Sequence, residues 1–147
     1  MGQITGKITC DWQDREEIRE LYARYSITLD HGDFDGWLEC FGADAIFDSP
    51  RFGHYEGREG LKHFVAQYKD SLGGAKPMHI NSNLSFEVEN DHATGVCYFT
   101  YYHCKDGRAI MAALGHYRDR LRRHADGWRI ERREVFVDAR AAGTSSR

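Results

Sequence analysis

The first half of the chain carries apolar residues at helical spacing. From Trp12 onward they fall mostly three or four positions apart, which predicts a long amphipathic helix with an N-cap at Asp11 and an end at His31-Gly32. Asp33 is expected to cap a short second helix, and Gly73-Gly74 to stop a third. The three apolar stripes are Ile18, Leu21, Tyr22, Tyr25 and Leu29; Phe34, Trp37, Leu38 and Phe41; and Leu61, Phe64, Val65, Tyr68 and Leu72.

Beyond Pro77 the pattern changes to a period of two. Leu84, Phe86 and Val88 alternate with polar residues, as in a half-buried strand. Asp106-Gly107 is the strongest hairpin-turn signal in the chain. Three more long strands are therefore expected over residues 93–104, 108–123 and 128–137, and a short hairpin over residues 45–49 and 51–55 precedes the third helix.

This order of elements predicts an α+β fold in a single domain. Helices come first and long antiparallel strands follow, so the helices should pack on one face of a bent sheet. Long strands twist and curl, and a curled sheet half covered by helices leaves a concavity. The expected domain spans residues 12–138, between an N-terminal extension over residues 1–11 and a flexible tail over residues 139–147.

Composition and charge remove several function classes. The 147 residues are 41% hydrophobic and 29% charged, with a formal net charge of −3, so no basic excess points to nucleic acid. No apolar run reaches the ~18 residues of a membrane span, and none near Met1 has the length of a signal peptide. The four cysteines form no Cys-x-x-Cys pair, which favours reduced thiols in a cytoplasmic protein.

Cofactor and metal motifs are also missing from the sequence. There is no Gly-x-Gly-x-x-Gly, Walker loop, Gly-x-Ser-x-Gly elbow or His-Glu-x-x-His, and the eight histidines are scattered. We therefore predict no cofactor and no metal site. Any catalysis should be acid–base work by His, Asp and Tyr side chains.

Two positions are candidates for that chemistry. Asp30 follows the buried stripe at the end of the first helix, where a carboxylate beside an apolar cavity either pairs with another group or titrates high. His79 opens the first long strand, and Asn81 and Asn83 are expected on the same face. A lone histidine at a strand start is more often structural than catalytic, so this pattern alone leaves both interpretations open.

The next two strands carry aromatic and basic faces. Aromatic residues are expected on both faces of residues 98–104. This pattern predicts a strand that is covered on both sides, either with a pocket on one side or simply as part of the core or of a dimer interface. One face carries Phe99, Tyr101 and His103, and the other carries Tyr98, Thr100 and Tyr102. The arginines beyond residue 117 are expected on a solvated face paired with acids such as Glu87, Glu89 or Glu131; they are Arg118, Arg120, Arg122, Arg123, Arg129, Arg132 and Arg133.

Several of these stretches together resemble the SnoaL-like family. They are the residues from Asp14 to Asp30, Gly32-Asp33, Trp37, Cys40-Phe41, Asp44-Ala45, Gly57 with Gly60-Leu61, Met78-His79 with Asn83, Gly115 to Asp119, and Gly127 to Ile130. The resemblance covers about residues 12 to 138 and implies the cone-shaped α+β fold of nuclear transport factor 2. It also implies a deep pocket between helices and sheet, and a homodimer or homotrimer.

Within that superfamily the chain looks most like the scytalone dehydratase, hexachlorocyclohexane dehydrochlorinase and bile acid dehydratase group. The resemblance implies a catalytic pair formed by Asp30 and His79, a second pocket histidine at His103, and a pocket tyrosine at Tyr25. Four positions depart from scytalone dehydratase, which makes scytalone itself a doubtful substrate; they are Leu29, Ser49, Gly115 and Tyr117.

These observations lead to one functional hypothesis with two alternatives. We expect a cofactor-independent lyase that acts on a small hydrophobic substrate, with His79 as general base held by Asp30, and Tyr25 and His103 as further catalytic groups. The expected substrate contacts are Tyr101, Phe99, Tyr117, Asn81 and Phe47, whereas Trp37, Phe41, Phe64 and Tyr68 are assigned to the core. A ketosteroid-type isomerase and a non-catalytic ligand-binding or oligomerisation module remain the alternatives.

Overall fold

The structure, a computed structural model, describes residues 12–142. The expected cap Asp11, the extension over residues 1–11 and residues 143–147 of the tail lie outside this range. The helices are α1 (Trp12–His31), α2 (Phe34–Leu38) and α3 (Gly57–Ser71). The strands are β1 (Phe41–Ser49), β2 (Gly53–Glu56), β3 (Lys76–Glu89), β4 (His92–Lys105), β5 (Arg108–His124) and β6 (Gly127–Arg140).

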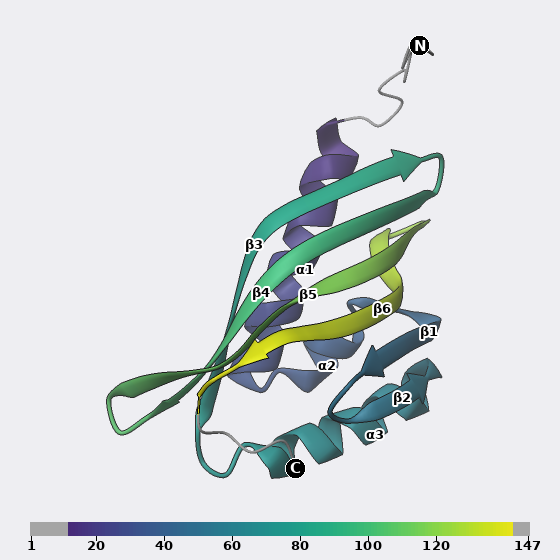
Figure 1. The fold of residues 1–147 in the computed structure, drawn as a ribbon. Coiled ribbons are helices and arrows are strands. Elements are labelled where there is room, and N and C mark those ends of the chain that lie inside the picture. The colour runs from purple at the N-terminus through teal and green to yellow at the C-terminus, as the bar shows by residue number, and fades with distance from the viewer. Residues whose placement is uncertain (1–11, 143–147) are drawn as a thin grey trace.

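The strands form one six-stranded sheet in the order β2-β1-β6-β5-β4-β3. All neighbouring pairs are antiparallel except β1 and β6, which run parallel. Figure 1 shows the long strands β3 to β6 curving together, with α1 running along them and α3 lying beside β1 and β2. The predicted α+β fold, with helices gathered against a curved, mainly antiparallel sheet, is confirmed.

The helices form where the apolar spacing predicts them, with one difference in extent. The Asp33 carboxylate accepts a hydrogen bond from the Gly36 backbone N–H at 2.9 Å, so the predicted cap of α2 is confirmed. Phe41 was assigned to the apolar face of this helix, but it begins β1, because the chain here pairs with β6. The Ile130 N–H donates to the Cys40 carbonyl at 2.8 Å, and this pairing with β6 outweighs the helical spacing of the apolar residues.

A bulge in β3 decides which side chains face the helices. Asn83 has a φ of 51° and is the extra residue in the pairing with β4, so the inward positions change from odd to even numbers. His79 therefore faces inward on one side of the bulge and Leu84 on the other. The prediction that Asn83 shares a face with His79 and Asn81 is wrong, because a simple alternation of faces does not allow for an inserted residue.

None of the three helices in the described part of the chain has the length and apolar character needed to cross a membrane. The last strand, β6, continues to Arg140, beyond the predicted strand end at Val137.

Candidate active site

Asp30 and His79 form a close, buried pair. Asp30 lies in the last turn of α1 and His79 near the start of β3. The His79 Nδ1–H donates to Asp30 Oδ1 at 2.6 Å, and the His79 backbone N–H donates to the other carboxylate oxygen at 2.8 Å. The His79 side chain is only 10% exposed and the Asp30 side chain 8%. Because the carboxylate can only accept, this contact places the Nδ1 proton on the ring and leaves Nε2 as the basic nitrogen.

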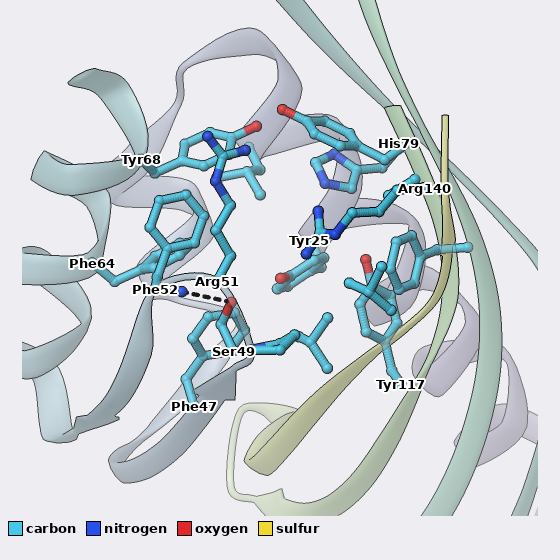
Figure 2. Close-up of a pocket in the computed structure, with 17 residues that line it drawn as sticks. Tyr25, Phe47, Ser49, Arg51, Phe52, Phe64, Tyr68, His79, Tyr117 and Arg140 are labelled. Atoms are coloured by element: carbon cyan, nitrogen blue, oxygen red, sulfur yellow. Dashed lines mark hydrogen bonds between the residues drawn. The ribbon is translucent and has the colours of Figure 1, made fainter. Parts of the chain in front are cut away.

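The His79 ring forms part of the wall of a pocket between the helices and the curved sheet (Figure 2). The cavity has a volume of about 90 Å³, and its wall is predominantly aromatic and aliphatic. The predicted site residues in this wall are Tyr25, Phe47, His79, Phe99, Tyr101 and Tyr117. The structure thus brings six of the nine predicted side chains to one cavity, drawn from α1, β1, β3, β4 and β5.

The other three predicted residues do not line the cavity. Asp30 lies behind His79 and reaches the pocket only through that ring. Asn81 was expected to contact substrate, but its side-chain amide donates to the Tyr22 carbonyl at 3.1 Å and to Ser26 Oγ at 2.9 Å, so it links β3 to α1. His103 does not line the cavity, but its ring contacts the hydroxyl of Tyr101, which does.

His79, Tyr101 and His103 form a continuous row along the pocket edge. The His79 and Tyr101 rings stack with centroids 4.5 Å apart, and His103 Nε2 lies 3.0 Å from the Tyr101 hydroxyl. Burial lowers the pKa of His103, and the positive charge of Arg51 and that of a protonated His79 lower it further. Burial raises the pKa of Tyr101. Tyr101 therefore keeps its proton at neutral pH and can donate a hydrogen bond into the pocket or toward His103.

A buried ion pair lies beneath the pocket floor. Arg133 is fully buried and donates to Asp119 through Nε and Nη2, both at 2.8 Å. Its guanidinium lies 4.1 Å from the Tyr25 ring centroid and 4.0 Å from that of Tyr117. Burial raises the pKa of Tyr25 to about 12, although the Arg133 charge opposes this rise. The solvated role expected for Arg133 is wrong, because its strand position alternates onto the inner face and Asp119 compensates its charge.

The pocket also contains residues that the sequence did not indicate as functional. Phe64 and Tyr68 of α3, assigned above to the core, line the cavity, and so do Arg51 and Arg140. Tyr68 is only 4% exposed, and its hydroxyl lies next to the Tyr101 hydroxyl. Helical spacing showed that Tyr68 is buried but could not show that its hydroxyl end meets a cavity.

Within the described residues, no group of three or more His, Cys, Asp or Glu side chains could hold a metal ion. Cys40, Cys97 and Cys104 are free thiols, and burial raises the pKa of both Cys40 and Cys97 to about 11. Cys10 lies outside the described residues. The Cys40 and Cys97 thiols are therefore protonated at neutral pH, and no cysteine of the described residues lines the pocket.

The architecture is that of nuclear transport factor 2-like proteins with a cystatin-like fold. One such protein, from Novosphingobium aromaticivorans, is 30% identical, with a TM-score of 0.79 over 89% of this chain and 86% of that one. A form of Rv3472, a protein of unknown function from Mycobacterium tuberculosis, is 27% identical, with a TM-score of 0.80 over 92% of this chain and 78% of that one.

The sequence matches lead to a particular family within this class. The SnoaL-like domain matches residues 11–134. The uncharacterized protein Rv2910c of Mycobacterium tuberculosis is 31% identical over 124 residues, 82% of each chain. The chain belongs to the SnoaL-like family, which includes cofactor-independent enzymes. The predicted family is thus confirmed, and the likeness to the dehydratase group stays a prediction.

Proposed function

We propose that this protein is a cofactor-independent lyase that removes a proton and a neighbouring leaving group from a small aromatic or alicyclic substrate. The observation that carries this proposal is the His79–Asp30 pair, whose free imidazole nitrogen belongs to a ring in the wall of an aromatic pocket. A neutral histidine with its tautomer fixed by a carboxylate is a suitable general base near neutral pH.

In the proposed step, His79 Nε2 takes a proton from a substrate carbon. The electron pair of the broken C–H bond forms a C=C bond to the adjacent carbon, and the leaving group departs with its own bonding pair. The imidazolium that results is balanced by Asp30, whose two oxygens accept both His79 hydrogen bonds. The positive charge that the base gains is therefore compensated within the pair.

A departing hydroxide needs a proton, and the Tyr101–His103 contact can supply one. The Tyr101 hydroxyl lies in the pocket wall, and His103 stands behind it at 3.0 Å. Tyr101 would donate its proton to the leaving oxygen and recover one through His103, which lies outside the cavity. Tyr25 and Tyr68 would donate hydrogen bonds to a substrate carbonyl, since burial keeps both phenols protonated.

The test is turnover of cyclic β-hydroxy and β-halo ketones in D₂O, followed by mass spectrometry. Wild-type protein should release water or halide, and His79→Ala should lower the rate roughly 10²–10⁴-fold because the base is lost. Asp30→Asn should lower it by a comparable order because the Nδ1 proton and ring orientation are no longer fixed. His92→Gln, on the exposed start of β4, is the matched control and should keep full rate.

The outcomes separate the three hypotheses. Full turnover by both His79→Ala and Asp30→Asn would contradict the lyase mechanism. A product that retains the leaving group and gains only the mass of deuterium would indicate an isomerase instead. Ligand binding with neither mass loss nor deuterium uptake would indicate a binding module.

A further inference from the structure

Two arginines enter the pocket from separate elements. Arg51 lies in the turn between β1 and β2, and Arg140 at the end of β6. Both line the cavity, and Figure 2 shows their side chains extending into it from opposite walls, Arg51 on the side of Tyr68 and Arg140 on the side of His79. They are the two cationic side chains of an otherwise largely apolar pocket wall that also contains His79.

Neither guanidinium forms an ion pair with a carboxylate of residues 12–142. Other arginines of the sheet do so; examples are Arg123 with Asp14, Arg129 with Asp126 and Arg132 with Asp48. The Asp30 carboxylate, which lies behind His79, accepts a hydrogen bond from His79 at each of its oxygens. Both arginines are exposed residues, and together they bring positive charge to the pocket that no carboxylate of residues 12–142 compensates, in a chain whose formal net charge is −3.

The backbone of both arginines is held in place. The turn that carries Arg51 is tied by the Phe52 N–H, which donates to Ser49 Oγ at 3.4 Å, and by the Tyr55 hydroxyl, which donates to the Phe52 carbonyl at 2.8 Å. Arg140 pairs with Ala113 in the sheet, and the next residue donates its N–H to Ala112 at 3.2 Å. Only the side chains need to adjust to a ligand, which lowers the entropic cost of binding.

We propose that Arg51 and Arg140 together bind an anionic group on the ligand of this pocket, so that the substrate is a small aromatic or alicyclic carboxylate. A guanidinium matches a carboxylate with two parallel hydrogen bonds, which are stronger than bonds between neutral groups. The ring of the ligand would then pack on Phe52, Phe64 and Phe99 of the wall. That the bound carboxylate is a substrate rests on the proposed lyase function, whereas its binding by the two arginines does not.

The experiment compares benzoate with benzamide, which has nearly the same shape but no charge, by isothermal titration calorimetry. Benzoate should bind wild-type protein roughly tenfold more tightly than benzamide, as expected for one charge-assisted contact. Arg51→Gln and Arg140→Gln should each reduce this preference, and the double variant should abolish it without weakening benzamide. Added salt should weaken benzoate alone.

Two controls make the result specific. Arg120→Gln removes an exposed arginine of β5 that does not line the pocket, and it should leave the preference unchanged. His79→Ala should retain the preference even if it abolishes turnover, so the anion site and the lyase mechanism can fail separately. The proposal is overturned if wild-type protein binds both ligands equally or binds neither, or if the double variant keeps the preference.

Discussion

His103 shows how strongly the environment of one residue controls its protonation in this pocket. Burial lowers its pKa below the usual 6.5, and Arg51 and His79 lower it further. The lowered pKa belongs to the folded protein, and the usual 6.5 to the unfolded chain. Between these two values the unfolded chain binds the proton more readily than the folded protein does. The His103 contribution to the free energy of unfolding therefore rises with pH across this interval, and it is fully present above pH 6.5.

We predict that Arg51→Gln raises the pKa of His103, because it removes a nearby positive charge that disfavours the imidazolium. Titration of the histidine ring resonances by NMR measures this directly and requires no substrate. In urea unfolding across the interval, the same variant should lose less stability than wild-type protein as the pH falls, because its folded-state pKa lies closer to 6.5. Arg120→Gln should leave the His103 titration unchanged, and an unaltered pKa in Arg51→Gln would refute the electrostatic coupling.

At the scale of elements, α1, β5 and β6 meet around one buried ion pair. Arg133 of β6 donates twice to Asp119 of β5, and Tyr22 of α1 donates its hydroxyl to the same carboxylate at 2.5 Å. Both charged side chains are fully buried. Removing one partner leaves the other charge buried without compensation, which costs more free energy than the intact pair contributes.

We predict that Arg133→Met lowers the free energy of unfolding by about 3–5 kcal/mol, and that Asp119→Asn has a comparable effect. The double variant should lose less than the sum of the two, because it leaves no unpaired charge in the core. Urea unfolding of the four proteins measures the coupling. The exposed Arg58–Glu39 pair serves as control, and its removal should cost less than about 1 kcal/mol. Additive losses at Arg133 and Asp119 would contradict the prediction.

Sequence periodicity predicted the elements better than it predicted the pocket wall. The position of Asp30 at the end of α1 and of His79 near the start of β3 follows from helical spacing and strand alternation. The inserted Asn83 and the inward position of Arg133 depend on pairing between strands, which a single-chain pattern does not contain. Arg51 and Tyr68 reach the pocket only because β1, α3 and β4 converge in space.

At the scale of the whole molecule, the outer face of the sheet carries exposed apolar side chains that residues 12–142 do not cover. Tyr98 of β4 pairs with His116 of β5, which pairs with Phe136 of β6, and His116 stacks on Phe136 at 4.8 Å. Tyr98 is 52% exposed. Other exposed apolar side chains on this face of β3, β4 and β5 are Met78, Ile80, Val96 and Leu114. An apolar surface of this extent is typical of a protein–protein interface.

We predict that this outer face joins copies of the chain into the homodimer or homotrimer that the family resemblance implies. Tyr98→Glu combined with Phe136→Glu would place a charge from each strand in the interface, where it is desolvated without a partner. Light scattering after size exclusion should then give the monomer mass, against a multiple of 17.0 kDa for wild-type protein. Ile27→Glu, at a position of α1 that is 58% exposed, is the matched control and should leave the assembly intact.

Because the outer face lies opposite the pocket lining of Phe99 and Tyr101 along β4, a monomeric variant should still bind benzoate. A wild-type monomer at all concentrations, or an unchanged mass in the double variant, would contradict this interface.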